Sequence, residues 1–156
     1  MAIKLEEEVE LLRRIPIFAK IEPSRLKLLA FTSDRVMYEA EQEICHQGDI
    51  GDAAYLIISG EADILIEAPT GPLAIASVGK NALVGEIAII NDVPRTATVR
   101  AKTKLEALKI KKEHFLRLVS EFPEMAIEIM RVLASRLSTT NEELTDARRR
   151  LSEATG

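Results

Sequence analysis

Residues 83–101 read LVGEIAIINDVPRTATVRA, and this stretch decides how the rest of the chain is interpreted. A glycine and a glutamate are followed by a short apolar turn and then by Pro-Arg-Thr-Ala. Glu86 and Arg95 stand nine positions apart, at the two ends of a predicted helix that is too short to be a core element. This arrangement indicates a pocket for a small phosphorylated ligand rather than a catalytic site.

Each residue type in this segment suits such a ligand. A short helix leaves the N–H groups of its first turn unpaired, and Ile87 and Ala88 would offer these amides to phosphate oxygens. Gly85 allows the backbone to approach closely, and Arg95 carries a planar fork that pairs with phosphate. Glu86 accepts hydrogen bonds and would hold a ribose hydroxyl. The spacing alone is equally compatible with a Glu86–Arg95 ion pair that caps a buried loop.

The composition narrows the class of protein. The 156 residues suffice for one domain, with 47% hydrophobic and 29% charged residues. The net charge of −4 argues against nonspecific nucleic-acid binding, and a single cysteine, Cys45, excludes an intrachain disulfide. No apolar run approaches the roughly 18 residues of a membrane span, and residues 6–8 are glutamates where a signal peptide would be apolar. We expect a cytoplasmic protein that does not bind membranes.

Before and after residues 83–101, the pattern is that of antiparallel strands. Apolar and polar residues alternate over 62–66, with turn residues before them at 59–60 and after them at 69–72. Short strands at regular spacing predict a mainly β fold, a sandwich or barrel. Other strands are indicated near residues 55–57, 75–78, 97–101 and 105–110.

Helices are predicted on both sides of this β core. One covers residues 3–14, and another begins near Pro23, with apolar positions at Leu26, Leu28, Leu29 and Phe31. After the core, a short helix over 113–119 precedes a long one from Pro123 to about Leu151. The domain therefore divides into an N-terminal helical segment, a β core and C-terminal helices, at residues 1–34, 35–112 and 113–152.

The long helix carries an apolar seam. Its second half, over 139–150, has few apolar residues apart from this seam and so has little surface to bury within the chain. A seven-residue apolar repeat is typical of a coiled coil, so we favour a homodimer through this helix over a helix packed on its own sheet. The seam consists of Met130, Leu137, Leu144 and Leu151, flanked by Ile127, Ala134 and Asn141.

Residues 83–101 resemble the phosphate-binding cassette of cyclic-nucleotide-binding domains, which occur in the catabolite activator protein, in regulatory subunits of cyclic-AMP-dependent protein kinase and in cyclic-nucleotide-gated channels. The family pattern is Phe-Gly-Glu-Leu/Ile-Ala-Leu, three or four variable residues, then Pro-Arg-x-Ala-Thr/Ser-Val. The resemblance covers about residues 15–150, and Val84 replaces the usual aromatic. The matching positions are Gly85, Glu86, Ile87, Ala88, Pro94, Arg95, Ala97, Thr98 and Val99.

The resemblance implies an eight-stranded antiparallel jelly-roll with N-terminal helices, a short cassette helix and a long C-terminal helix. It also implies a cyclic nucleotide as ligand, without a cofactor. Glu86 would take the ribose hydroxyl and Arg95 the phosphate. The amides of Ala88 and Thr96 would complete the phosphate cradle, and Val84 would line the base or sugar side.

The choice of base rests on weaker signals. Family members with a threonine at the position of Thr96 often accept cyclic GMP, although this hydroxyl can also bond the phosphate alone. Thr140 and Asn141 match positions where the catabolite activator places polar residues on the adenine amine. They can equally serve only to fix the register of a dimer. We expect cyclic AMP, with cyclic GMP as the competing ligand.

These observations predict a sensor module, whose C-terminal helix shifts on ligand binding and acts on an effector protein that the sequence does not identify. The alternative is a transcription regulator of the Crp/Fnr type without its DNA-binding domain. Because the sequence ends at Gly156, we do not expect direct DNA binding. A cupin-type enzyme would need clustered metal-ligand histidines, and His46 and His114 are far apart. We therefore expect neither catalysis nor a metal.

Overall fold

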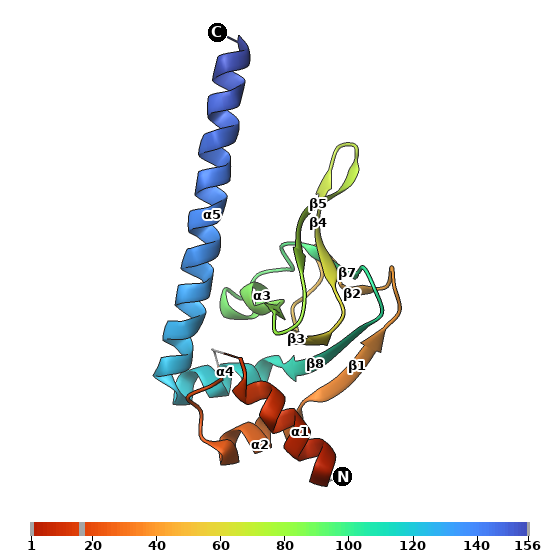
Figure 1. Ribbon diagram of the computed structural model, residues 1–156, viewed down its shortest axis with the longest axis vertical. Coiled ribbons are helices and arrows are strands. Elements are labelled where there is room, and N and C mark those ends of the chain that lie inside the picture. The colour runs from red at the N-terminus through yellow and green to blue at the C-terminus, as the bar shows by residue number, and fades with distance from the viewer. Residues whose placement is uncertain (1, 16–17, 156) are drawn as a thin grey trace.

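The computed structural model describes residues 2–15 and 18–155, with the backbone alone at residues 2–5, 87 and 155. Its centre is a β-roll of two antiparallel sheets, with helices packed beside it (Figure 1). In the part that is described, the strands are β1 (Asp34–Tyr38), β2 (Glu43–Cys45), β3 (Ala53–Ser59), β4 (Ala62–Ala68), β5 (Gly71–Val78), β6 (Leu83–Val84), β7 (Thr98–Ala101) and β8 (Leu105–Lys111).

The strand order is β1-β8-β3-β6 in one sheet and β2-β7-β4-β5 in the other. Strands that are adjacent in sequence therefore often lie in different sheets, as in a roll. The predicted fold class, eight antiparallel strands with flanking helices, is confirmed. The sequence pattern located β3, β4, β5, β7 and β8 correctly, since each has the alternation or the β-branched content of a strand.

The helices are α1 (Ala2–Arg13), α2 (Pro23–Thr32), α3 (Glu86–Ile90), α4 (Lys112–Glu121) and α5 (Pro123–Thr155). α2 and α5 begin at the predicted prolines, because proline lacks only an N–H that the first turn leaves unpaired anyway. α5 continues beyond its predicted end near Leu151.

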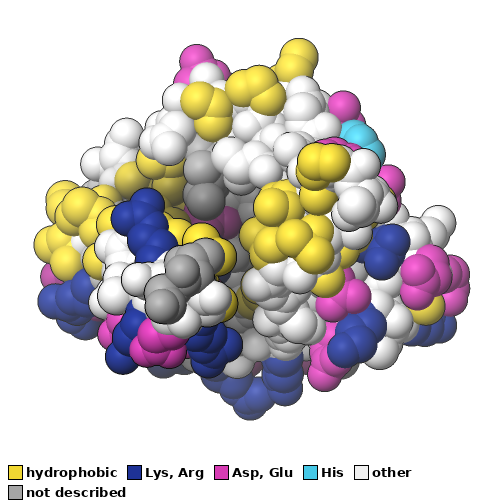
Figure 2. Space-filling view, turned by 90° about the horizontal axis from the view of Figure 1, so that it is seen from above, with side chains coloured by type: hydrophobic (Ala, Val, Ile, Leu, Met, Phe, Trp, Pro, Cys, Tyr) yellow, Lys and Arg dark blue, Asp and Glu magenta, His cyan; other side chains and the backbone are white. Residues whose placement is uncertain are grey.

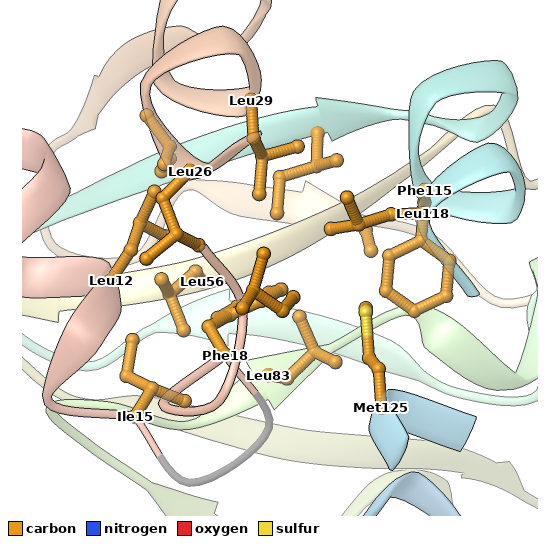
Figure 3. Close-up of a cluster of buried hydrophobic side chains, with 14 of the residues drawn as sticks. Leu12, Ile15, Phe18, Leu26, Leu29, Leu56, Leu83, Phe115, Leu118 and Met125 are labelled. Atoms are coloured by element: carbon orange, nitrogen blue, oxygen red, sulfur yellow. The ribbon is translucent and has the colours of Figure 1, made fainter. Parts of the chain in front are cut away.

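Two hydrophobic clusters hold the molecule together. One lies between the helices and the β1-β8-β3-β6 sheet, and contains Phe18, Phe115 and Met125 (Figure 3). The other fills the interior of the roll between the sheets. β3 serves both clusters because its side chains alternate: Leu56 faces the helices, and Tyr55 lies in the roll.

The burial of side chains in α2 differs in part from the sequence prediction. Leu26 and Leu29 are buried, as expected, whereas Leu28 and Phe31 are 54% and 76% exposed. Residues three apart share a helix face. The face of Leu26 and Leu29 therefore packs on the core, and that of Leu28 and Phe31 is turned outward.

α5 packs on the core only at its beginning. Met125 and Ile129 are buried, and the helix then runs beside the roll and continues beyond it (Figure 1). The four seam residues, Met130, Leu137, Leu144 and Leu151, are between 49% and 66% exposed. On the face seen from above, hydrophobic side chains form several exposed groups between charged and polar ones (Figure 2). No helix among the described residues is long and apolar enough to cross a membrane.

Candidate ligand-binding site

The cassette begins with a sharp turn at Gly85, between β6 and α3. The φ angle of Gly85 is 83°, in the left-handed region that side chains disfavour. A Cβ at this position would also collide with the Arg95 guanidinium. Gly51 is needed for a similar reason, because a Cβ there would collide with the side chain of Ala88 on α3. Two glycines thus let α3 and Arg95 pack closely at the mouth of the roll.

Arg95 is held by the backbone on both sides. Its Nη1 donates to the carbonyl of Gly85 at 2.8 Å, and its Nη2 donates to the carbonyl of Ala53 at 2.7 Å. Nη2 also lies 3.7 Å from the carboxylate of Asp52. The main chain of Arg95 pairs with the 48–49 turn, donating to the Asp49 carbonyl and accepting from the Gly48 amide. This buried guanidinium is therefore held in one position by contacts with the main chain.

Tyr55 lies next to Arg95, and Tyr38 and Cys45 pack against the same hydrophobic cluster inside the roll. The guanidinium carbon lies 5.9 Å from the centre of the Tyr55 ring, within range of a cation–π contact. Burial raises the pKa of the Tyr55 phenol. Burial also raises the pKa of the Tyr38 phenol, and the hydrogen bond between Tyr38 and Tyr55 offsets part of this increase. Burial likewise raises the pKa of the Cys45 thiol. These three groups are consequently neutral at physiological pH, and the charged groups here are Arg95 and the Asp52 carboxylate beside it.

Glu86 does not pair with Arg95, so the alternative of a Glu86–Arg95 ion pair is wrong. Instead its Oε1 accepts a hydrogen bond of 2.6 Å from Nη1 of Arg136, on α5. Nη2 of Arg136 also donates to the carbonyl of Leu83 at 3.3 Å. The pair lies at a crevice between β6 and α5, lined further by Ile129 and Leu133. Arg136 is not among the site residues predicted from the sequence.

Comparison with known proteins shows the family to which the chain belongs. The sequence profile described as "Cyclic nucleotide-binding domain" matches residues 35–122, from β1 to the end of α4. The chain belongs to the cyclic nucleotide-binding domain family. The profile includes the whole cassette, with Gly85, Glu86 and Arg95. The family resemblance noted in the sequence is confirmed.

The relatives of this cyclic nucleotide-binding domain are regulators. The "CRP-like cAMP-activated global transcriptional regulator" of Mycobacterium tuberculosis is 31% identical over 138 residues, which are 88% of this chain and 62% of that protein. The "cAMP-dependent protein kinase regulatory subunit" of Emericella nidulans is 34% identical over 108 residues, 69% of this chain and 26% of that protein. The chain thus spans less than two thirds of either relative.

Among solved structures, the catabolite activator protein of Thermus thermophilus resembles the cyclic nucleotide-binding domain described here with a TM-score of 0.73. The two are 29% identical, over 83% of this chain and 61% of that one.

The structure places the other predicted site residues of the cyclic nucleotide-binding domain at different depths. Val84 and Ala88 are buried, Gly85 and Ala97 are half-buried, and Thr96 is exposed; the backbone of Ile87 lies in α3. Thr140 and Asn141 are exposed on α5. The Thr140 hydroxyl donates to the carbonyl of Arg136, one turn earlier in its own helix. The structure therefore brings the cassette residues together and leaves the α5 pair facing solvent.

The two histidines lie apart from each other in the structure. No group of three or more His, Cys, Asp or Glu among the described residues is arranged to hold a metal ion. His46 pairs with Glu43 across 2.6 Å on the surface, and His114 lies on α4. What the site offers is a fixed cation, a carboxylate and backbone amides.

Proposed function

We propose that this protein binds a cyclic nucleotide in the cassette and acts as a regulatory module. The observation that carries the proposal is the buried Arg95 guanidinium, held by the carbonyls of Gly85 and Ala53 beside the first turn of α3. A positioned guanidinium next to unpaired helix amides suits a single phosphate group. Membership in the family supports the same ligand class.

Each cassette residue has a proposed role toward this ligand. Arg95 and the amides of Ala88 and Thr96 hold the cyclic phosphate, and Glu86 accepts the ribose 2′-hydroxyl. Val84 lines the base or sugar side. Gly85 provides the turn that leaves room for the guanidinium.

The proposed ligand is cyclic AMP. The names of both regulators described above contain cAMP, which supports this choice. The exposed Thr96 leaves a hydroxyl available for a guanine amine, so cyclic GMP is the competitor.

Side-by-side calorimetric titration with cyclic AMP and cyclic GMP tests the proposal. We expect both to bind at one site per chain, with cyclic AMP tighter by about tenfold or more, or about 1.4 kcal/mol. 5′-AMP, which has the same base but no cyclic phosphate, is the control and should bind more weakly. If neither cyclic nucleotide produces heat or raises the unfolding temperature, the proposed function is wrong.

The proposed output is a shift of α5 relative to the roll, transmitted to an effector protein. A ligand changes such an equilibrium only by as much as its affinity differs between the two states. The Glu86–Arg136 contact supports this coupling, because it links the cassette to α5. We predict that the protein is cytoplasmic, that it has no enzymatic activity and that it does not bind DNA directly.

A homodimer through α5 is part of the proposal, and the exposed seam supports it. Leu137→Asp combined with Leu144→Asp should give a monomer in sedimentation velocity, because buried aspartates opposite each other repel and lose hydration. The matched control is Ser135→Asp with Thr139→Asp, which puts the same charge on the opposite face of the helix and should leave the dimer intact. A dimer that survives the leucine changes would contradict the coiled-coil interpretation.

A further inference from the structure

We propose that the groove between α2 and α4 is a docking site for an acidic amphipathic helix of a partner protein. The inference goes beyond the proposed function, because it concerns another face of the molecule and does not depend on the ligand of the cassette. α2 and α4 lie at the end of the molecule opposite to the C-terminus of α5 (Figure 1).

The outward face of α2 carries two large apolar side chains that the core does not use. Leu28 and Phe31 are 54% and 76% exposed. They stand three positions apart and therefore share one face of the helix. Single exposed apolar residues are common on protein surfaces, but a leucine next to a phenylalanine beside a groove forms a patch of the kind found at interaction sites.

A groove of about 100 Å³ lies between α2 and α4, next to Leu28. Its most buried lining residues are Leu29 and Leu118, which also belong to the hydrophobic cluster between the helices and the sheet (Figure 3). Small-molecule pockets usually measure about 300–1,000 Å³, so this groove suits an apolar side chain of a protein partner better than a free ligand.

The length of the two helices indicates the size of the partner segment. α2 and α4 have 10 residues each, or about 15 Å at 1.5 Å per residue. A groove between two helices is suited to the apolar face of a third, amphipathic helix. A partner helix of about three turns would match the length of both walls.

The rim of the groove carries an excess of positive charge. Arg117 on α4 is exposed, and no carboxylate pairs with it in the part of the chain that the structure describes. Among the described residues that line the groove, the acidic one is Glu121, and Arg25 on α2 neutralises it at 2.9 Å. A partner with acidic side chains is therefore complementary to this rim, although the whole chain has a net charge of −4.

Arg25 also joins the two walls of the groove. Its Nη1 donates to the carboxylate of Glu121, and its guanidinium carbon lies 5.8 Å from the centre of the Phe122 ring, at the end of α4. These contacts hold α2 and α4 together in the protein without a partner. Docking into a groove that already exists costs little reorganisation.

The test uses three synthetic peptides and NMR spectra of the full chain. The acidic probe has about 15 residues, close to the shortest length that forms a helix in water, with leucines three and four positions apart and glutamates elsewhere. The second peptide has lysines in place of the glutamates, and the third has alanines in place of the leucines. We expect the acidic probe to shift the amide signals of α2 and α4, and to bind at least about 10-fold more tightly than either control peptide.

Variants at the groove separate its apolar and charged contributions. Leu28→Ser combined with Phe31→Ser should weaken binding of the acidic probe by more than about 10-fold. Arg117→Glu should reverse the preference, so that the lysine peptide binds more tightly than the glutamate peptide. Leu116→Ser, on the same helix but outside the groove, is the matched control and should leave the titration unchanged. Each variant should unfold at the temperature of the wild type and bind cyclic AMP equally well, because the cassette is not altered.

Other results would overturn the inference. Equal affinity for the glutamate and lysine peptides, or signal shifts outside α2 and α4, would contradict a docking site of this charge. Self-association that Leu28→Ser with Phe31→Ser abolishes would make this face a contact between copies of the chain. Binding to vesicles of phosphatidylcholine and phosphatidylglycerol that the same variant loses would assign the face to a lipid surface. Failure of the wild type to bind a cyclic nucleotide would refute the proposed function alone and would not affect this inference.

Discussion

Arg95→Ala is expected to lower the affinity for cyclic AMP by about 2–5 kcal/mol, or roughly 30-fold to several thousand-fold. The physical reason is that Arg95 is buried and already fixed by two carbonyl groups, so it would pair with a phosphate without first being ordered. Its removal would leave the ligand's charge without a cation in a poorly hydrated place. Isothermal titration calorimetry of the wild type and the variant measures the loss.

Two control variants make this prediction specific. Arg95→Lys keeps a positive charge but not the planar fork, and should lie between the wild type and the alanine variant. Arg100→Ala removes a half-exposed arginine that faces Glu41, and should bind cyclic AMP normally. Thermal unfolding without ligand shows whether each variant is folded. A folded Arg95→Ala protein with wild-type affinity would refute the assignment of the phosphate site.

Phe115→Ala is expected to reduce the free energy of unfolding by about 3–5 kcal/mol. Phe115 on α4 is completely buried in the cluster that joins the helices to the sheet, near Leu118 and Met125 (Figure 3). Truncation removes most of its apolar surface and leaves a cavity that the close-packed neighbours fill only partly. Urea unfolding followed by circular dichroism measures the change.

The neighbouring residue is the matched control for this prediction. Leu116 lies in the same helix but is 37% exposed, so Leu116→Ala should cost about 1 kcal/mol or less. Equal losses for Phe115→Ala and Leu116→Ala would mean that the helix-to-sheet cluster does not carry the stability assigned to it here.

The elements of this fold were predictable where a local pattern determines them. The alternation over 62–66 gave β4, and Pro23 and Pro123 marked two helix starts. The short helix after Gly85 also followed from its own residues. Strand order was not readable in this way, because it depends on pairings between distant segments such as β1 with β8.

The polar contacts of the site were less accessible to sequence reasoning. Glu86 and Arg95 look like partners in the sequence because they are close and opposite in charge, yet Glu86 pairs with Arg136, fifty positions away. That contact depends on how α5 is rotated against the roll, which the packing of Met125 and Ile129 sets. The seven-residue seam described the outer face of α5 and gave no information about the face toward the cassette.

α5 is packed on the core near its N-terminal end only, so a small rotation there would move its other end much further. Its buried anchors end at Ile129 and the helix continues to Thr155, about 39 Å further at 1.5 Å per residue. A rotation of about 5° at the anchors would displace the C-terminal end of the helix by about 3 Å. A displacement of this size is enough to change side-chain contacts in a helix interface. Arg136 contacts Glu86 seven residues after Ile129, so a displacement of Glu86 would be enlarged toward the C-terminal end of the helix.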